Sequence, residues 1–209
     1  MSEHDDEPIR GLPGFLPAGE QILWQGAPDP VALARSAFHA RSVALYFALL
    51  AAVAFGVATT QGSSLTGALV TVALGLVATG LLLLIGWLSA RATVYTLTDR
   101  RLVLRIGIAL PTCINLPLAR VAAIDLSNGG DIALRLAAPS PLGWIALWPH
   151  ARPWRLARPE PMLRALPDAA VVAARIAHAC LAVQPHARIV ARPIAPPAPT
   201  HTPPEQVAA

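Results

Sequence analysis

The side chains able to do chemistry are scattered along this chain, and no reactive set is evident. Catalysis needs a nucleophile with a base, paired carboxylates in one cleft, or a set of metal ligands. The two cysteines, Cys113 and Cys180, lie far apart, and neither has a histidine partner close by in sequence. This arrangement provides no disulfide framework and no metal-ligand spacing. The sequence therefore predicts a protein that is not an enzyme and that has no catalytic residue, metal site or cofactor.

The carboxylates and the histidine of the second half have ordinary structural interpretations. Three carboxylates lie at expected turns or helix caps: Asp99, Asp131 and Asp168. Asp125 is alone within an expected strand, where a hydrogen-bonded edge position is favoured. His150 has no partner nearby in sequence, so a surface or capping position is favoured over a pigment-binding or metal-binding one. The Gly129-Gly130 pair is a turn rather than a phosphate-binding loop.

A proline-rich segment carries the candidate interaction surface. Residues 149–161 contain four prolines, which exclude regular structure over most of the segment. Between them lie Arg152, Trp154, Arg155 and Arg158. Arginine and tryptophan often anchor interfaces, and fixed proline geometry lowers the ordering cost of binding. Two interpretations stay open: a stiff basic-aromatic surface for a protein or for lipid headgroups, or a core filled by Trp148 and Trp154 with the arginines merely solvated.

The uncharged stretch 42–90 must position this segment. It contains no Asp, Glu, Lys, Arg or His, and a polar turn at 61–64 divides it. At about 1.5 Å per residue, 42–60 and 65–87 have the length needed to cross a hydrocarbon core of about 30 Å. We expect two membrane-spanning helices joined by a tight turn. The alternative, a buried hairpin in a soluble protein, is disfavoured because neither helix has a polar face.

The arginines that flank the hairpin predict its orientation. Two precede the first span and three follow the second: Arg35, Arg41, Arg91, Arg100 and Arg101. Because arginine near span ends marks the cytoplasmic side, both termini are expected there, with the chain as a multi-pass protein of the inner membrane. Neither span contains an ionisable group, which disfavours a proton relay, an ion pathway or a transporter.

Small residues recur at four-residue intervals on both expected spans. On the first they are Ala48, Ala52, Gly56 and Thr60, and on the second Gly67, Thr71, Gly75 and Thr79. Small residues at this spacing let helix backbones approach closely in lipid. We expect the two helices to pack along this seam, although the high frequency of Gly and Ala in the chain is an alternative explanation.

The remainder divides into an N-terminal segment, a small domain and a tail. Residues 1–41 carry an acidic start, a short strand at about 20–26 and an interfacial helix. Residues 91–184 alternate as short strands, with one strand expected at 143–148, and end in a helix capped by Asp168. Residues 185–209 are proline-rich and expected to be a disordered tail. Residues 91–209 hold 13 arginines against six acidic residues, so an acidic protein surface or an anionic inner leaflet should attract them.

Two motifs flank the hairpin and carry a resemblance. The first is Gly19-Glu20-x-x-x-Trp24-x-Gly26-x-Pro28, and the second is Tyr95-x-Leu97-Thr98-Asp99-x-Arg101-Leu102. Their order resembles the membrane-anchored bacterial pleckstrin-homology-like domains, over about residues 19–28 and 92–183. The resemblance implies a membrane helical hairpin of two spans plus a bent antiparallel sandwich whose C-terminal helix plugs one end.

A second resemblance concerns function. Residues 147–164, together with Tyr95–Arg101 and Asn115–Pro117, look similar to the reaction-centre assembly proteins of purple phototrophic bacteria, which are encoded beside the reaction-centre H subunit. The likeness implies a non-enzymatic factor of the intracytoplasmic membrane that assembles the reaction centre, with a secondary effect on the core light-harvesting complex. Its expected partners are reaction-centre subunits, with core light-harvesting polypeptides, anionic lipids and a second copy of the chain as further candidates. No nucleic acid is expected.

An alternative function stays open beside this one. A lipid- or protein-binding pleckstrin-like module in general envelope maintenance would have the same anchor and the same basic surface. Gene neighbourhood and deletion in a phototrophic host would separate the two functions.

Overall fold

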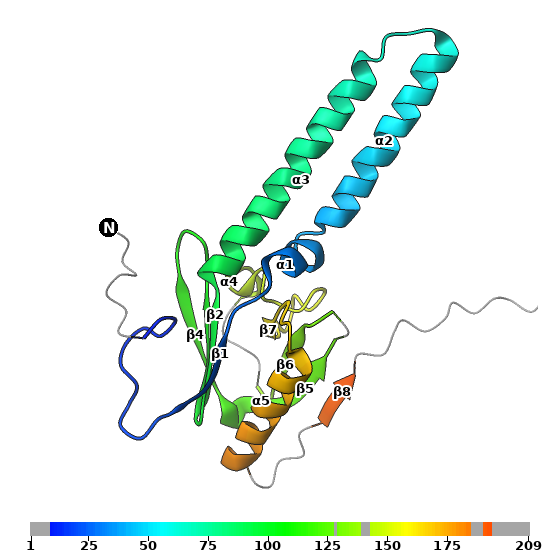
Figure 1. Cartoon of the computed structure of the whole chain (residues 1–209). Helices are drawn as coiled ribbons and strands as arrows, with labels where there is room; N and C mark the ends of the chain where they lie inside the picture. Colours follow the sequence, from blue (N-terminus) through cyan, green and yellow to red (C-terminus); the bar gives the residue numbers. More distant parts are fainter. Residues whose placement is uncertain (1–8, 128, 139–142, 185–189, 194–209) are drawn as a thin grey trace, which may run out of the picture.

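The computed structural model describes residues 9–127, 129–138, 143–184 and 190–193, with backbone alone for the last range (Figure 1). Two long helices, α2 (Ala40–Gln61) and α3 (Thr66–Ala92), form a hairpin that projects from a small mainly-β domain. The first eight residues of the acidic start and most of the predicted tail lie outside the described residues.

The hairpin is apolar on nearly all sides. Both helices are long and apolar enough to cross a membrane, and only 11% of the most apolar window of either helix is buried. That exposure contradicts a core hairpin buried within a single chain. Gly62 ends α2 in the left-handed conformation (φ 63°) and donates its N–H to the Ala58 carbonyl, which lets the chain reverse before α3.

Two four-stranded sheets form the domain. The first is antiparallel, in the order β1-β2-β3-β4, and contains β1 (Ile22–Gly26), β2 (Val94–Thr98), β3 (Arg101–Ile106) and β4 (Thr112–Pro117). The second has the order β7-β6-β5-β8, and contains β5 (Val121–Leu126), β6 (Ile132–Leu136), β7 (Met162–Leu163) and β8 (Val190–Pro193). The 3-10 turn η1 (Leu118–Arg120) joins β4 to β5. The predicted fold class is therefore confirmed.

The core lies between the sheets and is closed by α5 (Ala169–Val183). Buried side chains of β2, β3, β5 and β6 meet there, and alternation along β3 puts Leu102, Leu104 and Ile106 in this cluster. From α5, Val172, Ile176 and Ala179 are buried against the sheets. Leu181 and Val183, at the end of the helix, are exposed.

Two local predictions are wrong. The strand expected at 143–148 is a single helical turn, α4 (Trp144–Leu147), in which the Gly143 carbonyl accepts from the Ala146 N–H at 3.1 Å. Only Leu147 of that turn is buried, so no alternating face exists to stabilise a strand. Within the predicted tail, β8 pairs in parallel with β5, which supplies backbone partners to a strand edge that would otherwise stay open.

The two flanking sequence motifs form one clasp. The Glu20 carboxylate accepts from Arg101 Nε at 2.8 Å and Nη2 at 3.0 Å, and from Thr98 Oγ1 at 2.8 Å. Asp99 Oδ1 accepts from the Gln21 N–H at 3.0 Å. These contacts join β1, which precedes the hairpin, to the β2–β3 turn, which follows it, and so fix the hairpin on the first sheet.

Candidate interaction site at the base of the hairpin

The proline-rich segment is a loop closed at its base. The Arg152 N–H donates to the Glu160 carbonyl at 2.9 Å, and an antiparallel bridge joins Ala151 to Pro161. Residues 152–160 therefore form a defined projection, called here the basic loop. Trp154 is at its tip with a left-handed backbone (φ 64°), and its side chain is 94% exposed.

The basic loop exposes three of the four expected residues, and the fourth, Arg152, is half-buried. Trp154, Arg155 and Arg158 are exposed. Trp148 is 48% exposed and packs edge-on against Phe38, with ring centroids 5.4 Å apart. The interpretation in which Trp148 and Trp154 fill the core is therefore wrong. The exposed tip combines an indole with two guanidinium groups, a combination suited to binding an acidic or mixed surface.

Arg152 forms ion pairs within the protein, unlike the exposed Arg155 and Arg158 of the candidate surface. Its Nη1 donates to Glu160 Oε2 and to Asp125 Oδ2, both at 2.8 Å. Burial alone would lower the pKa of Arg152, but these hydrogen bonds outweigh it and raise the pKa. Asp125 also accepts from Arg135 Nη2 at 2.9 Å, so Asp125 is an ion-pair partner of the basic loop rather than a lone edge carboxylate. Arg152 holds the loop in place.

His150 is not at the surface, contrary to the sequence interpretation. It is fully buried at the start of the loop. Thr93 Oγ1 donates to the Ser89 carbonyl at 2.7 Å, and is therefore the acceptor for His150 Nε2 at 3.1 Å. Tyr95 donates its hydroxyl to Nδ1 at 2.8 Å and accepts the Arg164 N–H at 3.1 Å. This chain of hydrogen bonds fixes the imidazole tautomer and joins the end of α3 to β2 and to the chain after β7.

The surroundings of His150 keep it neutral. Burial, with the nearby Arg164 charge as a second cause, lowers the pKa of His150 from 6.5 to about 3. Burial also raises the pKa of the Cys180 thiol to about 11, which leaves little thiolate at neutral pH. Within the described ranges, no three His, Cys, Asp or Glu side chains are grouped so that they could hold a metal ion.

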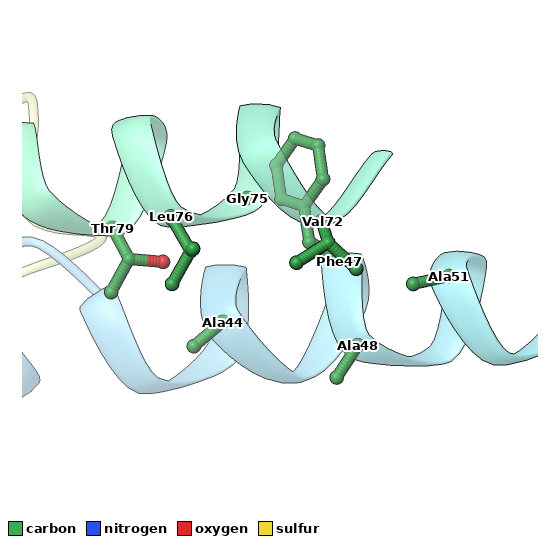
Figure 2. A pocket seen from close by; sticks show the side chains of 8 residues that line it. All are labelled: Ala44, Phe47, Ala48, Ala51, Val72, Gly75, Leu76 and Thr79. Carbon is green, nitrogen blue, oxygen red and sulfur yellow. The ribbon is translucent and has the colours of Figure 1, made fainter. Parts of the chain in front are cut away.

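The helix seam runs along a face of α2 that overlaps the expected one only at Ala48. Gly75 of α3 is buried, and a Cβ built there would lie 2.6 Å from the Phe47 Cβ. Around this contact is an apolar groove of about 260 Å³, whose lining is drawn in Figure 2: Ala44, Phe47, Ala48, Ala51, Val72, Gly75, Leu76 and Thr79. Of the expected seam, Gly75 is buried, Gly56, Thr71 and Thr79 are partly buried, and Ala48 lines the groove. Ala52 and Gly67 are exposed, and a Cβ on Gly56 or Gly67 would meet open space.

A second close approach, not anticipated from the sequence, joins the hairpin to the short helix α1 (Pro30–Ser36). A Cβ on Gly86 of α3 would lie 2.7 Å from the Ala34 Cβ. Asp29 caps α1 by accepting the Ala32 N–H at 2.7 Å, and its own N–H donates to the Ala165 carbonyl at 2.8 Å. Helix α1 is therefore held both by α3 and by the chain just after β7.

Between α1, α4 and the basic loop lies a cavity of about 340 Å³, called here the basal cavity. Figure 1 places α1 and α4 at the foot of the hairpin, where it meets the sheets. The lining includes Ser36, His39, Trp144, Trp148, Trp154 and Arg164. Sequence reasoning missed Ser36, Trp144 and Arg164, because they come from three separate segments that only the fold brings together.

Comparison with known proteins agrees with this architecture. The family model for the bacterial PH domain matches residues 43–179, which include nearly all of the hairpin and every strand except β1 and β8. The chain belongs to this family. It is also 36% identical over 204 residues to a Rhodobacter capsulatus protein named "Uncharacterized 23.7 kDa protein in puhA 5'region", an alignment that covers 92% of this chain and 95% of that protein. No solved structure matches.

Proposed function

We propose that the protein is a non-enzymatic membrane assembly factor for the photosynthetic reaction centre, with a secondary effect on the core light-harvesting complex. The observation that carries this proposal is the likeness to the puhA-region protein over nearly the whole of both chains. It agrees with the gene neighbourhood that the resemblance of residues 147–164 implies.

In this proposal the hairpin spans the inner, intracytoplasmic membrane and both termini are cytoplasmic. The arginines at the span ends support the orientation, since the hairpin turn has none. At the end of α3, the Arg91 guanidinium lies over the Trp87 ring, 5.4 Å from its centroid, a pairing suited to the membrane–water interface. The sheets and the basic loop then lie against the cytoplasmic face of the bilayer.

In the proposed mechanism the protein positions reaction-centre subunits and catalyses no reaction. The hairpin keeps the protein beside newly inserted reaction-centre subunits, and the basic loop contacts the cytoplasmic face of one of them. Trp154, Arg155 and Arg158 would make the contact, while Arg152 keeps the loop in shape through Glu160 and Asp125. A loop that is already ordered loses less conformational entropy on binding.

Deletion in a phototrophic host tests the role. Reaction-centre absorbance should fall strongly in the null strain, with core light-harvesting absorbance reduced as a consequence. A Trp154→Ala/Arg155→Ala variant should reproduce much of the loss at normal protein level, whereas Arg175→Ala, an exposed arginine on α5, should not. Normal reaction-centre levels in the null strain would refute the proposal.

A second candidate is a lipid-binding module of general envelope maintenance. The excess of arginine after residue 90 favours it, since anionic headgroups attract such surfaces. Two results together would support this candidate. Substituting Arg155 and Arg158 by Ala would abolish binding to anionic vesicles, and the null strain would assemble reaction centres normally.

A further inference from the structure

Unpaired polar atoms are concentrated around the basal cavity. Among the described residues, five buried side-chain nitrogen or oxygen atoms have no hydrogen-bond partner, and three of them belong to cavity-lining residues: Ser36 Oγ, Trp144 Nε1 and Arg164 Nε. Buried polar groups are normally satisfied, so three such atoms around one cavity call for an explanation. All three can donate a hydrogen bond.

Arg164 is the least ordinary of the three. Its residue is only 6% exposed, and the described contacts give its guanidinium one hydrogen bond, from Nη2 to the Ala151 carbonyl at 3.3 Å. No ion pair to Arg164 occurs among the described residues. Asp131 acts on its charge at longer range, but Asp131 Oδ1 accepts from the Ala165 N–H at 2.8 Å, and the two side chains are not hydrogen-bonded to each other. A buried cation without a counter-ion is costly, and a bound anion would remove that cost.

We propose that the basal cavity is a binding site for a phosphate-bearing anion, with Arg164, Ser36 and Trp144 as its ligands. No carboxylate is among the described residues that line the cavity, and every polar side chain among them can donate a hydrogen bond. Arginine pairs with phosphate through parallel N–H donors, which an oxygen-rich group matches better than a neutral ligand.

The position of the cavity points to a phospholipid headgroup as the source of the phosphate. Ser36, Ala37 and His39 immediately precede α2, so this wall lies where the apolar helices begin. The Phe38–Trp148 contact joins that wall to the chain after α4. A headgroup could occupy the cavity while its acyl chains lie along the hairpin. The inference is independent of the assembly role, and only its lipid source requires the hairpin to lie in a bilayer.

The test uses the full chain reconstituted in nanodiscs of equal parts phosphatidylglycerol and phosphatidylcholine, with the lipids that stay bound identified by native mass spectrometry. The wild type should retain phosphatidylglycerol preferentially. Arg164→Gln should reduce the preference at least tenfold, and Arg175→Gln, the same charge change on an exposed α5 residue, should leave it intact. Ala37→Leu fills the cavity without altering charge and Trp144→Phe removes one donor, so both variants should weaken retention even if Arg164→Gln fails to fold.

A second arm distinguishes free phosphate from lipid. Inorganic phosphate at millimolar concentration is added to the detergent-solubilised, delipidated chain, with chloride at equal ionic strength as the control. A rise in melting temperature that disappears in Ala37→Leu supports the site and identifies free phosphate as a competent ligand. Equal retention of the two lipids together with no phosphate effect overturns the proposal. So does a preference that Ala37→Leu and Trp144→Phe leave unchanged but that Arg155→Ala/Arg158→Ala abolishes.

Discussion

His150 and Tyr95 form a buried polar pair that connects the hairpin to the sheets. The imidazole bonds Thr93, just after α3, on one side and Tyr95 of β2 on the other. Because each member uses its neighbour as donor or acceptor, removing one leaves the others unpaired in a dry environment. The value of the pair is therefore structural, and it should be visible in stability rather than in binding.

Tyr95→Phe tests that view at a single oxygen atom. The substitution leaves His150 Nδ1 and the Arg164 N–H without their partner, so we expect the free energy of unfolding to fall by about 1–3 kcal/mol. Tyr46→Phe is the matched control, since Tyr46 is exposed on α2. Tryptophan-fluorescence melting of the detergent-solubilised protein measures both. Equal melting temperatures for Tyr95→Phe and wild type would contradict the assignment.

The depressed pKa of His150 gives stability a defined pH dependence. The unfolded chain binds a proton at this histidine below about pH 6.5, whereas the folded chain does so only near pH 3. The contribution is fully present above the unfolded pKa and is lost as the pH falls from about 6.5 toward 3. Melting temperature measured at intervals across this range should fall with pH in the wild type, and less steeply in His150→Gln. If melting temperature depended on pH in the same way in both proteins, the prediction would be wrong.

The two long helices show which features of a helix can be predicted from the sequence and which cannot. An uncharged run broken by one polar turn leaves few alternatives, so the existence of the hairpin could be foreseen. The contact face of α2 could not, because a strict four-residue repeat drifts about 40° around a helix at each step. The α2 positions that line the groove are Ala44, Phe47, Ala48 and Ala51, spaced at intervals of three and four, and Ala48 alone belongs to the expected repeat. The role of His150 could not be predicted either, for a different reason. Its hydrogen-bond partners lie 57 and 55 residues away in the sequence, and only the fold brings them together.

A comparison of Gly75 with Gly56 tests whether a glycine in the hairpin is needed for helix packing or only reflects the high glycine content of the chain. A leucine at Gly75 would collide with Phe47, so Gly75→Leu should force α2 and α3 apart and cost about 1–3 kcal/mol. Gly56→Leu meets open space and should be nearly silent. Accumulation in the membrane and melting temperature in detergent measure the difference. Equal behaviour of the two variants would show that the Gly75–Phe47 contact does not stabilise the hairpin.

At the scale of the whole molecule, the chain closes on itself around the hairpin. Strand β1 comes before the helices and β2 after them, and the Glu20–Arg101 clasp joins the two. Both ends of the hairpin therefore meet the same sheet, and a hairpin that crosses a membrane must have its flanking segments on one side. This constraint comes from strand pairing, and it agrees with the orientation inferred from arginine placement.

Topology fusions test that constraint directly. A reporter active only in the cytoplasm should be active when fused before residue 9 and also when fused after residue 193, and a periplasm-specific reporter should be inactive at both places. A periplasmic reporter inserted at Ser63, in the hairpin turn, should be active, because the turn emerges on the opposite side. Glu20→Gln weakens the clasp without altering the helices, so it should lower the melting temperature and leave all three reporters unchanged. Opposite locations for the two termini would be incompatible with β1–β2 pairing, and would refute the membrane model and the proposed cytoplasmic contact together.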